Sequence, residues 1–160
     1  RDRIRRCRVV QAWRIAKKAY ALDRSGAGGI AEGGRWHHRG QPAIYAGLSV
    51  AICAMEKLVH TGPILPRDLV LVRLELPEGP GLFEELNPGD LPGWADIPPG
   101  DASQAYGSDF LRTGRALGLI VPSAIVPESK NLLLNPAHPR FADVQMVVER
   151  PFTYDARLRP

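Results

Sequence analysis

Cysteine and long apolar runs are scarce in this chain of 160 residues. Two cysteines, Cys7 and Cys53, are too few for the disulfide framework of a small secreted domain, so we expect free thiols in a reducing cytoplasm. No apolar run approaches the roughly 20 residues that cross a membrane, and no apolar segment follows the basic start as in a signal peptide. The sequence therefore predicts a cytoplasmic protein with no membrane partner.

Common cofactor motifs are also missing. There is no Gly-x-x-x-x-Gly-Lys-[Ser/Thr] phosphate loop, and the four histidines lack zinc-type spacing with one another or with the cysteines, so we expect no metal. Residues 26–31 match a loose dinucleotide-binding pattern, but two more glycines and Pro42 follow where that motif requires a helix. Gly47-Leu48-Ser49 matches the first three residues of a nucleophile elbow, but Ala51 replaces the second glycine of that motif. Ser49 is therefore better interpreted as a helix N-cap.

Positive charge is concentrated at one end of the chain. The whole chain carries +4, but residues 1–18 carry +7, which leaves −3 for the rest. Runs of like charge repel themselves, so we expect residues 1–8 to form a mobile basic arm beside a domain at 9–160. The acidic body argues against direct nucleic-acid binding, although a nucleic-acid-binding or RNA-cleaving module that uses the arm remains an alternative.

The composition and patterning predict one α+β domain. Hydrophobic residues make up 44% and charged residues 24%, which is ordinary for a soluble domain, while 16 Gly and 15 Pro predict many turns. Residues 23–34 and 77–100 are expected loops. Strands outnumber helices, which favours a mixed, strongly bent sheet with long functional loops. The predicted helices cover 49–60 and 101–115, and the predicted strands cover 9–15, 42–46, 68–76, 117–121, 124–126 and 144–149.

Five polar residues stand in apolar surroundings. Glu56 lies in an apolar helical stripe, where burial is costly unless the carboxylate is paired or used. Arg14 lies in the first strand, Arg35 follows two glycines, Tyr45 ends a strand, and Ser123 lies between two predicted strands. Each has an ordinary structural explanation, such as a surface ion pair or core packing. Together they would suit an anionic sugar phosphate, because arginine holds phosphates and a carboxylate stabilises positive charge on a sugar.

The order of these residues closely resembles the RES domain family, whose name comes from its Arg, Glu and Ser. The resemblance covers about residues 9–158 and departs from the family at His37, where Asn is common, and at Lys57, where a small or apolar residue is common. It is carried by Trp13-Arg14-Ile15-Ala16, Gly33-Gly34-Arg35-Trp36, Ala43-Ile44-Tyr45-Ala46, Met55-Glu56-Lys57-Leu58-Val59-His60, Leu69-Val70-Leu71-Val72, Leu91-Pro92-Gly93-Trp94, Val121-Pro122-Ser123-Ala124 and Asn131-Leu132-Leu133-Leu134-Asn135-Pro136.

The resemblance implies a fold, an activity and a partner. The fold would be that of NAD-dependent ADP-ribosyltransferases, a split mixed β-sheet with flanking helices. The protein would be the toxin of a type II toxin–antitoxin pair that cleaves the nicotinamide–ribose bond of NAD+ with water or inorganic phosphate. An Xre-type helix-turn-helix antitoxin would occlude its active site. The implied catalytic residues are Glu56, Arg35, Tyr45 and Ser123, and the implied substrate-binding residues are Arg14, Arg35, Tyr45 and Asn135.

Other readings of the same residues remain open. One is transfer of ADP-ribose to a protein, and another is a non-catalytic interaction domain whose polar residues are structural. The sequence does not choose among water, phosphate and protein as the acceptor, and it leaves open whether the chain forms a homo-oligomer.

Overall fold

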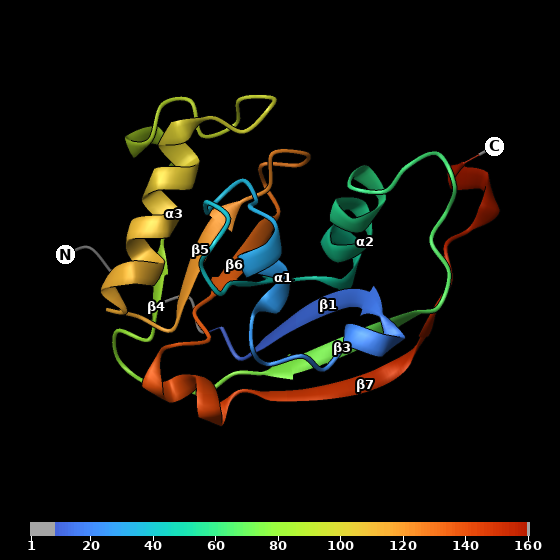
Figure 1. Ribbon diagram of the computed structural model, residues 1–160, viewed down its shortest axis with the longest axis horizontal. Helices are drawn as coiled ribbons and strands as arrows, with labels where there is room; N and C mark the ends of the chain where they lie inside the picture. The colour runs from blue at the N-terminus through green and yellow to red at the C-terminus, as the bar shows by residue number, and fades with distance from the viewer. Residues whose placement is uncertain (1–8, 160) are drawn as a thin grey trace.

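The computed structural model describes residues 9–159, so the predicted arm at 1–8, with Cys7, lies outside the described residues. Seven strands of this part form one sheet, and three α-helices accompany it (Figure 1). The strands are β1 (Gln11–Lys17), β2 (Ile44–Gly47), β3 (Leu69–Glu75), β4 (Phe83–Glu85), β5 (Gly118–Pro122), β6 (Lys130–Leu134) and β7 (Gln145–Phe152). The helices are α1 (Ala27–Ala31), α2 (Val50–Val59) and α3 (Asp101–Thr113), with short 3-10 turns η1 (Lys18–Tyr20), η2 (Pro88–Asp90), η3 (Pro139–Asp143) and η4 (Ala156–Leu158).

The sheet is mixed and split between β1 and β2. Its order is β4-β5-β6-β2-β1-β3-β7, with β4 and β5 parallel and every other neighbouring pair antiparallel. β1 pairs with β3 from Gln11 to Lys17, but with β2 only at Trp13 and Gly47. Because this contact is so short, the two halves of the sheet diverge on either side of it. The predicted α+β domain with a split mixed sheet is confirmed.

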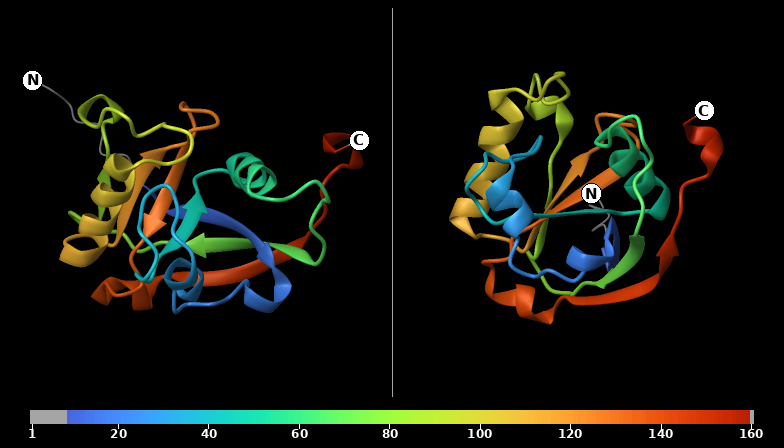
Figure 2. Two further views of the ribbon diagram at one scale, coloured as in Figure 1. Left: turned by 45° about the horizontal axis from the view of Figure 1, so that its top comes forward. Right: turned by 45° about the vertical axis from the view of Figure 1, so that its right-hand side comes forward.

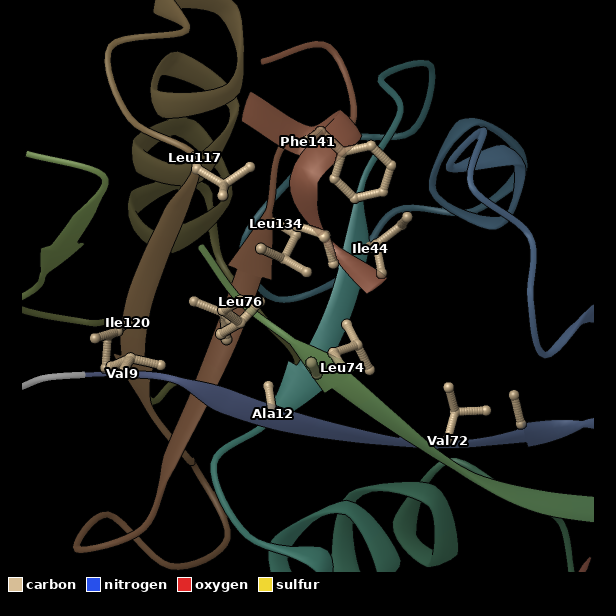
Figure 3. Packing of buried hydrophobic residues seen from close by; sticks show 14 of the residues in the cluster. Val9, Ala12, Ile44, Val72, Leu74, Leu76, Leu117, Ile120, Leu134 and Phe141 are labelled. Carbon is tan, nitrogen blue, oxygen red and sulfur yellow. The ribbon is translucent and has the colours of Figure 1, made fainter. Parts of the chain in front are cut away.

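One hydrophobic cluster joins the two halves of the sheet. Strand β3 alternates, so Val72 and Leu74 face this cluster while Leu71 faces a second one on the opposite side. Ile44 of β2 and Leu134 of β6 complete it from the other half (Figure 3). Burial of these residues supplies the main driving force that holds the halves together.

The two longer helices flank the sheet at different places. Helix α3 packs Phe110 and Leu111 into a cluster with Leu119 of β5 and Leu133 of β6. Helix α2 packs Cys53 against β1, where the thiol donates a hydrogen bond to the Trp13 carbonyl at 3.0 Å. Figure 2 shows α3 beside the β4–β5 end of the sheet and α2 over β1. None of the helices within residues 9–159 is long and apolar enough to span a membrane.

Three local predictions differ from the structure. The glycine-rich segment 23–34 contains α1, and the loop predicted at 77–100 contains β4 and η2. The strand predicted over 124–126 is absent, because the Ser123 hydroxyl accepts the backbone N–H groups of Ile125 and Val126 at 3.1 and 3.3 Å. Such a side-chain turn competes with strand pairing. Ser123 therefore ends a strand instead of joining two.

Candidate functional site

The Glu56 carboxylate is the centre of the site. Helix α2 begins at Ser49, whose side chain accepts the Ile52 N–H at 3.2 Å, so the predicted N-cap is confirmed. Two turns further on, Glu56 Oε1 accepts hydrogen bonds from Ser123 Oγ at 2.8 Å and Asn131 Nδ2 at 2.7 Å. Ser123 follows β5 and Asn131 lies on β6. Residues from three elements therefore meet at one carboxylate oxygen.

The surroundings of Glu56 keep it ionised. Burial alone would raise the pKa of this carboxyl, but the nearby His60 imidazole and the hydrogen bonds from Ser123 and Asn131 outweigh burial and lower the pKa below its ordinary value. The side chain is 26% exposed, so the charge is partly shielded from water and still reachable. A half-buried, fixed negative charge can stabilise a positive charge that develops beside it.

His60 faces the other carboxylate oxygen. His60 Nε2 lies 3.7 Å from Glu56 Oε2, one helical turn away. The nearby Glu56 carboxylate raises the pKa of His60, and burial and the positive charges of Arg35 and Lys57 oppose that rise. Because the charge of Arg35 acts on His60, Arg35 lies within electrostatic reach of the Glu56 site.

Arg35 connects this site to the proline-rich loop. Arg35 Nη1 donates to the carbonyls of Trp94 and Asp96 at 2.9 and 2.8 Å, and the ring of Trp36 stacks on Trp94 with centroids 6.3 Å apart. The guanidinium predicted to bind substrate therefore also holds residues 94–96 in place. Sequence reasoning missed this bond, because both acceptors are backbone carbonyls about 60 residues away.

The segment that carries Arg35 rests on α3. Gln104 Nε2 donates to the Gly34 carbonyl at 3.1 Å, and the His38 N–H donates to Ser108 Oγ at 2.9 Å. Gly107 allows this close approach, since a Cβ added there would lie 1.6 Å from the Trp36 carbonyl oxygen. The helix thus fixes the backbone on both sides of Arg35.

Tyr45 belongs to a buried network with His37. His37 Nε2 lies 3.0 Å from the Gly29 carbonyl, which can only accept, so Nε2 carries the proton and Nδ1 accepts from the Tyr45 hydroxyl at 2.7 Å. The hydroxyl in turn accepts the Trp36 N–H at 3.2 Å. Burial raises the pKa of Tyr45, so the phenol stays neutral. His37 was not predicted as a site residue, and the signal for it was its departure from the Asn that is common after Arg-Trp in the family.

Arg14 is a buried cation at the split of the sheet. It follows Trp13, the last residue of β1 paired with β2. Its Nη1 is buried and has no hydrogen-bond partner among the described residues. Burial lowers the pKa of Arg14, while Asp23 and Cys53 act in the opposite direction. A buried donor without a partner is costly, and an anionic ligand would satisfy it.

Asn135 lies away from Glu56. It follows the last residue of β6, whereas Asn131 and Ser123 lie at the other end of the β5–β6 pair. Its Nδ2 donates to the Leu111 carbonyl at 3.0 Å and its Oδ1 accepts the Ala137 N–H at 3.0 Å. The structure therefore brings Ser123 and Asn131 to Glu56, not Asn135. Asn131 and Asn135 belong to one run, residues 131–136, and the sequence pattern does not show which of the two amides faces the carboxylate.

Within residues 9–159 no group of three or more His, Cys, Asp or Glu side chains is placed to hold a metal ion. The thiol of Cys53 is free and buried, and burial raises its pKa to about 12, so it is an unreactive thiol.

Comparison with known proteins identifies relatives of this chain and a solved structure with the same fold. The chain is 41% identical over 152 residues to the "Prs ADP-ribosylating toxin" of Sphingobium sp. (strain YBL2), covering 91% of this chain and 94% of that protein. It is also 41% identical over 150 residues to "Toxin Res" of Pseudomonas putida, covering 91% and 97%. A chain of the crystal structure of the M. tuberculosis MbcT-MbcA toxin-antitoxin complex shares the fold, with a TM-score of 0.60, 21% identity, and coverage of 89% of this chain and 85% of that one.

The split seven-stranded sheet thus gives this single-domain protein the fold of a chain in a solved toxin–antitoxin complex. A family model described as the RES domain matches residues 11–155. The chain belongs to the RES domain family, as the order of its motifs predicted.

Proposed function

We propose that this chain is the toxin of a type II toxin–antitoxin pair and an enzyme that breaks the nicotinamide–ribose bond of NAD+. The observation that carries the proposal is Glu56, an ionised carboxylate with Oε1 held by Ser123 and Asn131 and Oε2 turned toward His60. Breaking this bond creates an oxocarbenium-like transition state, as in glycoside cleavage. A fixed carboxylate stabilises that cation without reorganising during the reaction.

The bond changes need little proton transfer. As the ribose C1′–nitrogen bond breaks, its electron pair stays on the cationic ring, which leaves as neutral nicotinamide. An oxygen of water or phosphate then bonds to C1′; water loses a proton to solvent, whereas an ionised phosphate oxygen has no proton to lose. No strong general acid is required, which agrees with a site whose central carboxyl is ionised rather than protonated.

The remaining candidates supply binding and orientation. The buried Nη1 of Arg14 suits a phosphate or ribose oxygen of NAD+, and Arg35 suits the second anionic group while it holds the 94–96 loop. Tyr45, fixed by His37, packs on the nicotinamide side. Ser123 and Asn131 orient Glu56. The side-chain nitrogen and oxygen of Asn135 are both hydrogen bonded to backbone groups at the far end of β6, so we assign Asn135 to support of the fold and not to substrate binding.

A second candidate acceptor is a protein. The name of the 41% identical Sphingobium relative states that it ADP-ribosylates Prs. Transfer to a protein uses the same bond cleavage at Glu56 and differs only in the group that attacks C1′. Inorganic phosphate and water are the other acceptors in the proposal.

The proposed partner is an antitoxin. The similar fold in the MbcT-MbcA complex belongs to a toxin–antitoxin pair. We propose an Xre-type helix-turn-helix antitoxin that covers the Glu56 site in the cytoplasm and so silences the toxin in the producing cell. Purified complex should then consume NAD+ far more slowly than the free chain, and full-rate consumption by the complex would contradict occlusion.

The test follows NAD+ and its products over time with purified protein, with and without inorganic phosphate, and with added cell lysate. Loss that requires phosphate, accompanied by a phosphorylated ADP-ribose product, means phosphorolysis, and phosphate-independent loss means hydrolysis. Adducts of ADP-ribose mass on a lysate protein mean protein transfer. Intact NAD+ and unmodified protein under all three conditions would contradict the proposed enzyme.

A further inference from the structure

His60 faces the open oxygen of the catalytic carboxylate, and the proposed reaction does not use it. Glu56 Oε1 is occupied by Ser123 Oγ and Asn131 Nδ2 at 2.8 and 2.7 Å. Glu56 Oε2 is left as the oxygen that can face a ribose cation, and His60 Nε2 lies 3.7 Å from it. Any charge on His60 therefore acts on the oxygen that the chemistry needs.

The His60 side chain is placed to exchange protons with solvent. It is 76% exposed, whereas His37 is buried between Tyr45 and the Gly29 carbonyl. The position is the C-cap of α2, where the helix dipole favours a cation.

Charged groups from two segments face this imidazole. Glu56 and Lys57 lie on α2 itself, and Arg35 lies on the segment that precedes β2. The carboxylate favours the imidazolium, and both cations oppose it. Glu56 acts more strongly than the two cations, so the net effect of these groups is to raise the pKa of His60.

We propose that His60 is a positioning residue that controls access to Glu56 Oε2, so that NAD+ is cleaved when the imidazole is neutral and resisted when it is an imidazolium. The inference rests on the proposed function. An imidazolium pairs with Oε2 and cancels the charge that would stabilise the ribose cation. The imidazolium also repels the cationic nicotinamide ring of NAD+, so both effects slow cleavage.

The direction of the pH dependence follows from this. The pKa of His60 lies above its ordinary value of about 6.5, so the wild-type rate should rise with pH through a midpoint above about 6.5. Without His60, the fall in rate at low pH should move to the titration of Glu56, whose pKa then lacks the lowering that His60 supplies. At pH 6, where less than about a quarter of wild-type His60 is neutral, the His60→Gln variant should be about fourfold faster than wild type or more.

The experiment measures kcat/KM for NAD+ from about pH 5 to about pH 8.5 in wild type, His60→Gln and the matched control His38→Gln. His38 is an exposed histidine that takes part in the structure through its backbone N–H. The expected result is that the fall in kcat/KM at low pH disappears in His60→Gln and remains in wild type and His38→Gln. The same fall in all three proteins would overturn the role of His60 while leaving the proposed function intact. If wild type left NAD+ intact at every pH, both proposals would be overturned.

An NMR titration of His60 gives a readout independent of turnover. Glu56→Gln removes the carboxylate charge, so the His60 midpoint should fall toward about 6.5 or below. An unchanged midpoint would overturn the pairing, and a fall would support it even in an inactive protein.

Discussion

At the residue scale, Glu56 illustrates how neighbouring dipoles decide the charge of a half-buried carboxyl. Burial favours the neutral acid, but the hydrogen bonds from Ser123 and Asn131 and the nearby His60 imidazole favour the carboxylate and prevail. Hydrogen bonds to charged groups contribute about 1.5–3 kcal/mol each, so losing one donor matters.

Ser123→Ala should give a folded but impaired enzyme. The variant removes one donor to Glu56 Oε1 and the hydroxyl that accepts the N–H groups of Ile125 and Val126. We expect nicotinamide release to fall about tenfold or more, because one hydrogen bond to a charged group is lost. Circular dichroism and thermal unfolding check the fold. Turnover of Ser123→Ala at the wild-type rate would show that Ser123 has only a structural role.

Arg14→Met should separate stability from activity. The buried Nη1 of Arg14 has no partner among the described residues, and Met fills similar space without charge. We expect the ligand-free melting temperature to stay equal or rise, while kcat/KM for NAD+ falls at least tenfold. ADP-ribose should raise the melting temperature of wild type more than that of the variant. A clear loss of ligand-free stability would show that Arg14 supports the fold instead.

At the element scale, strong local signals made α2 and β3 predictable. The alternation of apolar and charged residues predicted β3, and an N-cap at Ser49 followed by an apolar stripe predicted α2. Strand β4 has only three residues inside a loop rich in Pro and Gly, and each pairs with a residue of β5 that lies 35 positions further along the chain, so no local pattern marked it. The order of motifs pointed to Glu56 and Ser123, whose contact the structure shows. Asn131, His37 and the Arg35 bonds depend on long-range packing, which one sequence does not reveal.

The segment that carries Arg35 depends on α3, and Gly107→Ala tests this. A methyl group at Gly107 would overlap the Trp36 carbonyl, so the segment must move. Overpacking of this kind costs about 1–3 kcal/mol. We expect a lower melting temperature together with a fall in NAD+ turnover.

The matched control is Gly62→Ala, where a new Cβ meets nothing within 4 Å. It should leave turnover unchanged. Equal turnover in Gly107→Ala and wild type would contradict the view that α3 positions Arg35.

At the scale of the whole molecule, the split sheet and the uneven charge have separate consequences. The halves of the sheet meet at one registered pair, Trp13 with Gly47, and Arg14 follows directly. Helix α2 lies over β1 and carries Glu56 toward the β5–β6 pair (Figure 1). The reacting groups thus come from both halves, whereas the excess positive charge lies in the first 18 residues.

Removal of residues 1–8 should therefore leave NAD+ cleavage unchanged, because no proposed site residue lies there. If the basic arm instead bound nucleic acid as the main activity, binding would show a steep salt dependence that disappears on deletion. Binding titrations at two salt concentrations, beside an NAD+ assay of both proteins, distinguish the two accounts.

The most direct test of the account is the rate of nicotinamide release from NAD+ by Glu56→Gln compared with wild type. Gln keeps the size of the side chain and an oxygen that can accept from Ser123 and Asn131, but it removes the charge. Glu32→Gln, on an exposed position after α1, is the matched control. We predict release by wild type and Glu32→Gln and a loss of at least about 100-fold in Glu56→Gln, whose cooperative thermal unfolding shows that the domain is still folded. A folded Glu56→Gln protein that releases nicotinamide at the wild-type rate would contradict the assignment.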